Sequence, residues 1–503
     1  MTTGWGSTDN GSLCSQAMAG FFARSQSVTS DNAARQELVS RSRILYMESP
    51  IARSCIDVLL RECVGAGLRY TPKYVSAYFE NYAAISGILA DDLRKASDLH
   101  LLEASHRLTF PQIQALVFRT ILLSGDCFLI RQSDGTFSIY EPDYFFTPPF
   151  LTLDMTHTAR TETGNKVIDG VEIDDFGTPV AYWMCRNLYG EEARKLEDAW
   201  VRIPAVDDAT GMPMVLHCAY VDRPQQYRGI PLIAPVIADL WSLRAYLTSE
   251  TQMAILQCNQ SWVVTTNTNP TVSPFVGLSM KDLDAPLVPD APKGDKEASK
   301  DFSIAPQVDS NFNVAPMETS LFNGALRKTN FIQPGSSIHL AEGESIQAIQ
   351  PTAPHSGLKT FLDCVIDQIG AAVGIPAQIL TAHIDSNYSS AKASFAQLQH
   401  TVRHYRAAFI ETFLKPFFEC FAYDEITAND WTSDKYTNSE AAALLATESV
   451  WLPSSAATIL EPQRELEFYK GALELGLISR DEVANLLFGH DARGEEQPTA
   501  EEI

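Results

Sequence analysis

The sequence lacks the features that would place the protein in a membrane or in an oxidising compartment. It has no apolar run of about 18 residues, the length that favours a membrane-spanning helix. Its N-terminus contains neither a basic stretch nor an apolar core, so we expect no secretory signal. Nine cysteines are scattered, odd in number and never arranged as C-x-x-C. We therefore expect free thiols in a reducing environment.

Basic residues are scarce. The chain has 38 Lys and Arg against 62 Asp and Glu, which gives a net charge of −24 and a pI of about 4.8. A protein that grips nucleic acid tightly normally presents a basic field. Either the protein has no contact with nucleic acid, or it must let nucleic acid pass without binding it. Simple solubility explains the acidity equally well.

Motifs for catalysis and for nucleotide binding are also missing. The sequence has no Walker A loop, no H-E-x-x-H and no G-x-S-x-G, and the glycines at 65–67 follow a helical pattern rather than a strand. His400 and His404 are one helical turn apart, but no third metal ligand accompanies them. Ser389 and Ser390 lie close in sequence to Asp and His residues on a single loop, which rarely gives triad geometry. We predict no catalytic residue, no metal site and no cofactor.

The residue pattern predicts an α+β protein. With 503 residues, of which 45% are hydrophobic, the chain can bury two or more cores. Helical periodicity runs from about residue 31 to Gly65 or Gly67, and again over roughly 74–124. Residues 125–222 form a β-rich layer, because alternating stretches flank turn signals at 133–135 and 175–177.

Long helices dominate the second half of the pattern. Apolar spacing predicts helices at 233–258 and 358–373, separated by a stretch over 265–333 that is rich in Pro, Thr, Asp and Lys and reads as an exposed insertion. A further helix is expected over 389–420, with a kink at Pro416. An amphipathic helix and a capping box at Ser479 and Glu482 follow near the C-terminus.

The stretch 382–395 is the most informative. A loop of small and polar residues leads into the 389–420 helix, and the apolar residues from Phe395 to Phe417 recur along one face of it. Asn387 or Ser389 is the expected N-cap, and we expect the loop to contribute no core residue. A mobile loop at the end of a stiff helix suits a segment that contacts a moving molecule. The pattern therefore favours a mechanical or scaffold role.

Short strings within residues 31–495 occur together in one order. The main strings are Val64–Leu68, Gly170–Glu172 with Gly177–Tyr182, His217 with Arg223–Pro231, Gly374–Pro376, Asn387–Ala391 and Gly476–Arg480. Taken in this order, they resemble the lambda-type tailed-phage portal proteins, also called head–tail connectors. Three positions differ from the residue that is usual in that family: Glu48 stands for Asn, Gln225 for Gly and Lys392 for Arg.

The resemblance implies a fold and a division of the chain. The fold is an α+β portal fold with long stem helices, β-rich wing and clip parts and a helical C-terminal crown, assembled as a ring. The parts expected are a disordered N-terminal arm at 1–30, the wing at 31–231, a stem helix at 232–258, the clip at 259–355, a second stem helix at 356–374, the tunnel loop at 375–388, the long tunnel helix and wing return at 389–439, and the crown with an acidic tail at 440–503.

The resemblance also implies a function. Twelve copies would form a ring at one capsid vertex, the conduit for genome packaging by the terminase and for genome ejection. Expected partners are the terminase large subunit, head-completion or adaptor proteins, the major capsid protein and double-stranded DNA that passes non-specifically, but no membrane. The protein would reside in the virion and, during assembly, in the host cytoplasm. The alternatives are another structural or scaffold protein of the virion, or a capsid-associated hydrolase.

Two groups of site residues follow from that resemblance. One group lies in or beside the tunnel loop and would face DNA, and the other lies in the clip and would contact the terminase or adaptors. The DNA-facing residues are His383, Asp385, Asn387, Tyr388, Ser389 and Lys392, and the clip residues are Lys281, Asp284, Lys293, Lys296 and Lys300.

Overall fold

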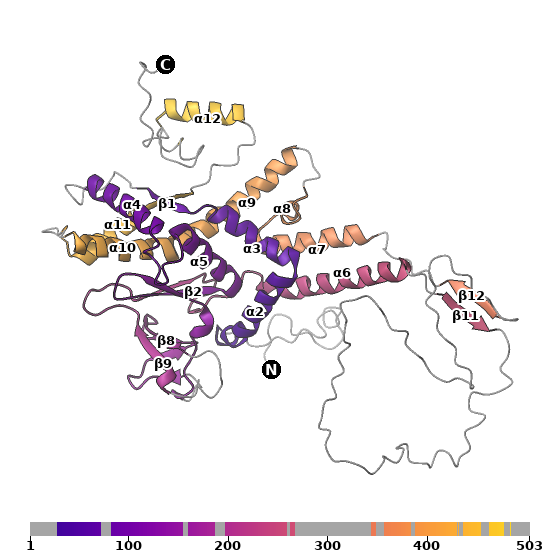
Figure 1. Ribbon diagram of the computed structural model, residues 1–503, viewed down its shortest axis with the longest axis horizontal. Coiled ribbons are helices and arrows are strands. Elements are labelled where there is room, and N and C mark those ends of the chain that lie inside the picture. The colour runs from indigo at the N-terminus through magenta and orange to yellow at the C-terminus, as the bar shows by residue number, and fades with distance from the viewer. Residues whose placement is uncertain are drawn as a thin grey trace, which may run out of the picture. The chain divides into compact units, whose positions relative to one another are not determined.

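The computed structural model divides into two compact units. The first comprises residues 1–248 and 356–503, and the second comprises residues 249–355. Each is described by itself below (Figure 1). The structure describes residues 28–71, 82–153, 159–186, 197–258, 262–266, 344–348, 357–383, 388–429, 431, 436–453, 462–476 and 483. The predicted N-terminal arm up to residue 27 and the capping box at Ser479 and Glu482 lie outside these residues.

The first unit begins with the helical base predicted from the sequence. Ser49 separates the first two helices, and its side chain accepts a hydrogen bond from the amide of Ala52, which caps the second helix. The fourth helix of the base starts with a capping box between Thr109 and Gln112. These helices are α2 (Val28–Glu48), α3 (Pro50–Cys63), α4 (Tyr82–Asp98) and α5 (Phe110–Ser124).

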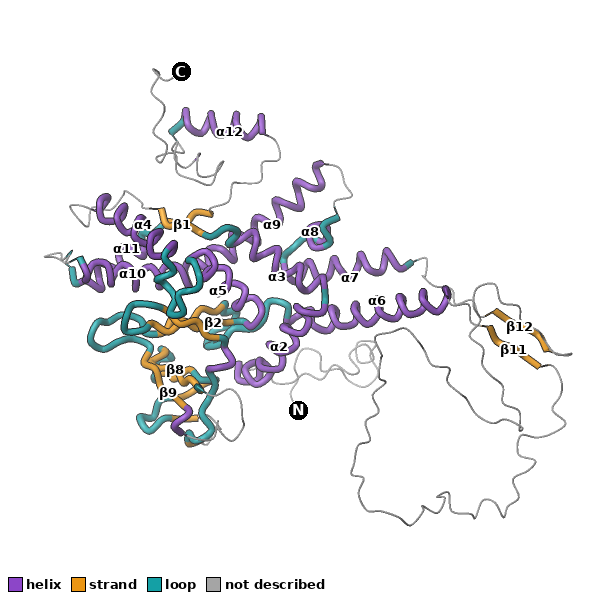
Figure 2. Tube along the Cα trace, in the orientation of Figure 1, coloured by secondary structure: helices purple, strands orange, loops and turns teal. Residues whose placement is uncertain are grey.

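The β-rich layer expected over 125–222 is confirmed as two antiparallel sheets, drawn in orange in Figure 2. The first has the order β10-β2-β3, and the second is a meander from β4 to β9. Both predicted hairpin turns join neighbouring strands, β2 to β3 and β7 to β8. The strands are β2 (Asp126–Arg131), β3 (Phe137–Tyr140), β4 (Thr152–Leu153), β5 (Ala159–Arg160), β6 (Lys166–Ile168), β7 (Val171–Ile173), β8 (Pro179–Cys185), β9 (Trp200–Pro204) and β10 (Val215–Ala219).

A buried ion cluster joins the helical base to these sheets. The Arg228 side chain is fully buried, and its guanidinium pairs with the Asp126 carboxylate at the start of β2. The same guanidinium donates to the carbonyl oxygens of Phe145 at 2.9 Å and Pro142 at 3.1 Å. Arg35 of α2 reaches Asp169 at 2.6 Å. One buried cation thus ties together segments from β2, the loop after β3 and the turn between β6 and β7.

Charge and stacking both stabilise this cluster. Burial alone would raise the pKa of the Asp126 carboxyl, but the positive charge of Arg228 and the hydrogen bond with His217 hold that pKa well below its usual range. Burial lowers the pKa of His217, whose ring stacks on Phe128 with centroids 4.2 Å apart. Arg228 also lies over the Phe128 ring, 5.0 Å from its centroid. The cluster is therefore an ionised pair enclosed by aromatic rings.

The helix predicted over 389–420 is longer than expected and contains an irregular turn. It comprises α9 (Tyr388–Phe409), a π-helical turn (Ile410–Leu414) and α10 (Lys415–Ala428). Pro416 has no amide hydrogen, so it cannot donate to the carbonyl of Thr412. The thiol of Cys218 on β10 takes that place and donates to the Thr412 oxygen at 3.4 Å. The π turn and this thiol together accommodate the proline, and the helix continues instead of ending near residue 420.

Four further elements of the first unit follow from the pairing of distant segments and from helix capping. β1 (Leu68–Thr71) pairs with β13 (Val450–Pro453), which brings Tyr70 against Trp451. α11 (Asn438–Thr447) packs on α10 and is capped by Thr437. α12 (Pro462–Glu474) is the predicted amphipathic C-terminal helix.

The second unit is described only at its two ends. It contains the last turns of α6 (Ile237–Cys258) and an antiparallel pair of strands, β11 (Trp262–Thr266) and β12 (Glu344–Ala348). The Pro-rich insertion predicted over 265–333 lies almost entirely outside the described residues.

The Arg228 cluster predicts a large effect of one substitution on stability. Replacing Arg228 by Met leaves the Asp126 carboxylate buried without its counter-charge, which should lower the free energy of unfolding by about 3–5 kcal/mol. Urea denaturation followed by circular dichroism measures this change. The control is Arg53→Met, because Arg53 is exposed, where it pairs with Asp57 and lies over the Tyr46 ring. Equal unfolding midpoints for the two variants would show that the cluster does not stabilise the fold.

Candidate functional site: the paired helices and the turn that joins α7 to α9

Two long helices are buried at one end and exposed at the other. α6 buries Leu240 and Leu243 in the core of the first unit, and α7 (Leu358–Val373) buries Ile369 and Val373. Leu247, on the apolar side that the residue spacing gives to the 233–258 helix, is 42% exposed. Among the described residues, the apolar side of α6 is therefore buried over its first turns and exposed further along.

The solvent-facing sides of these two helices carry large apolar side chains. Trp241 of α6 is 57% exposed and Phe361 of α7 is 50% exposed. Phe361 also contacts Tyr246 of α6, with ring centroids 5.2 Å apart. An ion pair between Glu48 of α2 and Arg244 fixes the start of α6 to the helical base. Glu48, one of the positions where the sequence departs from the usual pattern, thus has a structural partner.

The turn from α7 to α9 is closely packed. α7 ends at Gly374, whose φ of +79° favours glycine, and a β-carbon there would lie 2.9 Å from the Thr401 hydroxyl. That hydroxyl donates to the Gly374 carbonyl at 2.7 Å. The short helix α8 (Ala377–Leu380) follows, and Figure 1 shows it between the ends of α7 and α9. Ser394 of α9 donates to the Gln378 side chain at 3.3 Å.

The expectation that the tunnel loop has no core residue is wrong. Ile375 is 1% exposed and Leu380 is 4% exposed, and both belong to the main hydrophobic core. The Ser54 hydroxyl of α3 donates to the Leu380 carbonyl at 2.8 Å. The sequence did not indicate that Leu380 is buried, because a helix of one turn is too short to show apolar periodicity. Among the described residues of the predicted loop, the exposed part after Leu380 is 381–383.

α9 is anchored to α3 on its inner face. Arg406 donates to the carbonyl oxygens of Cys63 at 3.0 Å and of Glu62 at 2.5 Å, which are unsatisfied groups at the C-terminus of α3. The Cys63 thiol donates to the Val402 carbonyl at 3.7 Å, and burial raises the pKa of this thiol to about 12. α9 is therefore held in its C-terminal half, and its N-terminal end is joined to the segment that follows the α8 turn.

The predicted DNA-facing residues are only partly described. His383 lies directly after the α8 turn and is exposed, and Lys392 is exposed on the second turn of α9. α9 begins at Tyr388, next to the predicted N-cap Asn387. The side chains of Tyr388 and Ser389, and the whole of Asp385 and Asn387, lie outside the described residues. The same holds for the clip residues Lys281, Asp284, Lys293, Lys296 and Lys300.

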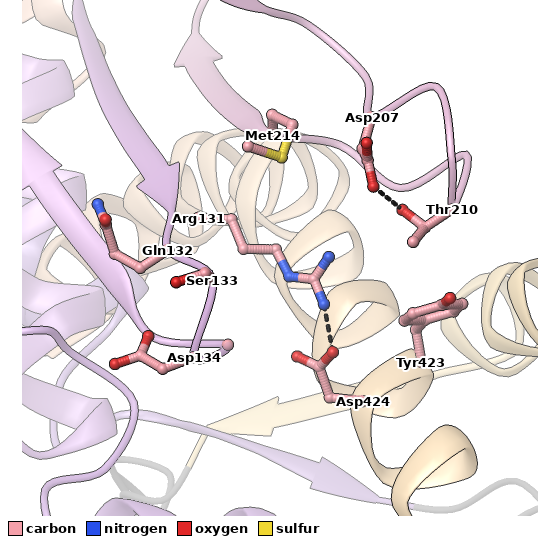
Figure 3. Close-up of a pocket in the computed structure, with 10 residues that line it drawn as sticks. Arg131, Gln132, Ser133, Asp134, Asp207, Thr210, Met214, Tyr423 and Asp424 are labelled. Carbon is pink, nitrogen blue, oxygen red and sulfur yellow. Dashed lines mark hydrogen bonds and ion pairs between the residues drawn. The ribbon is translucent and has the colours of Figure 1, made fainter.

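A polar cavity lies elsewhere in the first unit, between the β2–β3 turn, the loop after β9 and α10. Its volume is about 530 Å³. Figure 3 shows Arg131 in its centre, paired with Asp424, and Asp207 bonded to Thr210 at 2.7 Å. Asp134 accepts from its own turn at Thr136. Each carboxylate is thus engaged in holding local structure, and none of the lining residues is a His or Cys.

Neither a metal site nor a membrane-spanning helix is found among the described residues. Among the described residues, no group of three His, Cys, Asp or Glu side chains could hold a metal ion. His400 and His404 both lie on the exposed side of α9. No helix in the described part of the chain is long and apolar enough to cross a membrane.

Sequence reasoning missed two residues that position this site, Arg228 and Arg406. His217 and Arg228 belong to strings that the sequence analysis singled out, and the structure brings both to Asp126. A fully buried Arg cannot be recognised from hydropathy, so only its place in such a string signals it. Gly229, the next residue, lies so close to Gly125 that a β-carbon would be 1.9 Å from the Gly125 oxygen.

The packing of the α8 turn gives a testable prediction. Leu380→Ala removes a buried side chain and should lower the free energy of unfolding by about 2–5 kcal/mol, since the site cannot fully collapse. Gln399→Ala on the exposed side of α9 is the control and should have little effect. Thermal unfolding measures both. If the two variants unfold at the same temperature, the turn is not part of the core.

Comparisons with known proteins complete the description of this site. No curated protein matches the sequence. Similar solved structures include the neck of an empty gene transfer agent particle computed with C6 symmetry (13% identity, 90% of this chain and 93% of that chain, TM-score 0.43). Another is the neck of the native particle computed with C12 symmetry (12% identity, 90% and 92%, TM-score 0.41). The identification rests on residues 15–406, which match the phage portal proteins of the lambda family. The chain belongs to the lambda family of phage portal proteins.

Proposed function

We propose that this portal protein forms a ring of twelve copies at one capsid vertex and that double-stranded DNA enters and leaves through the central hole. The observation that carries the proposal, beside family membership, is the exposed apolar surface of α6 and α7. Trp241, Leu247 and Phe361 are 57%, 42% and 50% exposed. A monomer gains nothing from large apolar side chains in water, whereas a neighbouring copy that covers them stabilises the assembly.

A ring suits helices of this kind. In a closed ring each copy uses two different faces, one toward each neighbour. Helices that stand side by side can bury their outer faces against the next copy and leave an axial hole. Burial of one large apolar side chain contributes about 1.5–3 kcal/mol, and the contribution recurs at every interface of the ring.

The charge of the chain suits a channel that DNA passes without adhering. A net charge of −24 repels phosphate groups, so a wall made of this protein does not bind DNA strongly. A few basic or polar side chains near the α8 turn can still touch the DNA backbone without reading bases. We assign this role to His383 on the tunnel loop at 375–388 and to Lys392 beside it on α9.

The remaining roles follow from the same proposal. The clip at 259–355 docks the terminase large subunit during packaging and head-completion or adaptor proteins afterwards, and the wing meets the major capsid protein. The protein is a structural component of the virion, assembled in the host cytoplasm, and is not an enzyme. Packaging and ejection use one path through the same ring.

The exposed apolar surface predicts which substitution prevents assembly. Trp241→Glu places a charge where a neighbouring copy should pack, so the variant should fold but form far fewer rings. Negative-stain microscopy counts rings with an axial hole, and circular dichroism checks folding. Phe176→Glu is the matched control, because Phe176 is 95% exposed on a wing turn far in sequence from the paired helices. Normal rings from Trp241→Glu would remove α6 from the interface.

The tunnel loop can be tested without disturbing the core. Deletion of residues 384–387 spares Leu380 and the α8 turn, so rings should form normally. Because the deletion removes the segment assigned to DNA contact, packaging or retention of DNA should fail. Counts of full and empty heads in infected cells, with rings assayed in parallel, measure the effect. Full heads at the wild-type level would exclude this segment from the DNA path.

A further inference from the structure

α9 differs in charge from the rest of this acidic chain. Its 22 residues contain no Asp or Glu, yet they include Lys392, Arg403 and Arg406 as well as two histidines. Arg406 faces inward to the end of α3. Arg403 and both histidines are exposed, so the outer face of α9 is basic and free of acids.

Arg403 has no counter-charge in the described part of the chain. None of the ion pairs there includes it, and its positive charge acts on Arg406. Burial lowers the pKa of the Arg406 guanidinium and the nearby charge of Arg403 lowers it further, whereas the charge of Glu62 raises it. Arg406 thus has a carboxylate nearby within its own subunit, while Arg403 is the guanidinium that an outside carboxylate or phosphate would stabilise.

The outer face of α7 carries two carboxylates and one lysine. Lys359, Asp363 and Asp367 follow one another at intervals of one helical turn and all are exposed, so the face is acidic on balance. Within the described residues neither aspartate has an ion-pair partner. Because α7 and α9 are linked through α8 and held together by the Thr401–Gly374 bond, the two faces lie on neighbouring elements of one unit.

We propose that in the ring the basic outer face of α9 in one copy lies against the acidic outer face of α7 in the next copy. The inference rests on the proposed ring. Copies that each carry a net charge of −24 repel one another, and a ring must offset this repulsion where the copies touch. Because α9 contains no Asp or Glu, the carboxylates of a neighbouring copy approach it with the least electrostatic repulsion. Such charge contacts also fix the register between copies.

DNA is the competing occupant of the α9 face. Arg403 follows Lys392 by 11 residues, so the two lie about 16 Å apart along the helix axis. They can both reach a neighbour that runs alongside α9. A helix that points its N-terminal end at DNA would keep Arg403 at a distance from the phosphates. The observations therefore favour a second copy of this chain.

A charge-swap experiment tests the proposal. Arg403→Glu, and separately the pair Asp363→Lys with Asp367→Lys, should each lower the yield of rings by at least about tenfold, because like charges then meet at every interface. Combining all three substitutions restores opposite charges and should bring the yield back to within about threefold of wild type. Arg94→Glu and Asp91→Lys on α4, which are exposed residues of the same charges, are the controls.

Cross-linking gives an independent measurement. Cys364 is exposed on α7 between the two aspartates, whereas the other six described free cysteines are buried. With Arg403→Cys, a short bismaleimide should join copies into a ladder of covalent oligomers on a denaturing gel. Changing Cys364 to Ser in the same variant should abolish the ladder. A ladder that persists, or none in either variant, counts against the proposed contact.

Each result of the swap decides between explanations. If wild type and all variants form rings equally, the proposed contact is wrong while the ring stands. If Arg403→Glu forms normal rings but yields empty heads, the α9 face meets DNA and the inference is overturned. If wild type forms no ring, either purified or in assembled particles, the proposed function fails together with this inference. Melting by circular dichroism verifies that every variant folds.

Discussion

The first unit depends on the ion pair between Arg228 and Asp126. Both side chains are fully buried, so the pair exists only because carbonyl oxygens, a histidine and an aromatic ring replace the water that each group gives up. Removing either partner leaves the other charged and unsolvated. Since the cluster draws on a helix, two sheets and the loops between them, it fixes the β-rich layer on the helical base.

A second set of contacts places the part assigned to DNA. Backbone carbonyls accept from side chains at three points: Ser54 on Leu380, Thr401 on Gly374 and Arg406 on the end of α3. Such bonds fix backbone rather than side chains, so they set the direction in which α9 leaves the body. The segment between the α8 turn and α9 can then change in sequence while the direction of α9 stays the same.

Much of this architecture can be predicted from the sequence. The helix over 358–373 and both hairpins were expected and are confirmed, because a long apolar period and an Asp-Gly or Gly turn are local signals. The buried cluster could not be predicted, because Asp126 and Arg228 are far apart in the chain and charged residues are normally exposed. Leu380 was missed because α8 is a single turn. Periodicity alone left open whether Leu247 belongs to a core or to an interface between copies, because both need apolar residues on one side of a helix.

The π turn ahead of Pro416 has a consequence for how the long helix resists force. In a regular α-helix, residues four apart drift by roughly 40° per step around the axis. The wider π turn rotates less per residue and offsets that drift, so Phe409, Phe413 and Phe417 form one column with neighbouring ring centroids 5.2 and 5.5 Å apart. Phe118 and Phe110 brace the two ends of the column from α5. A push on the N-terminal end of α9 would then travel along a stiff aromatic spine into the body of the subunit.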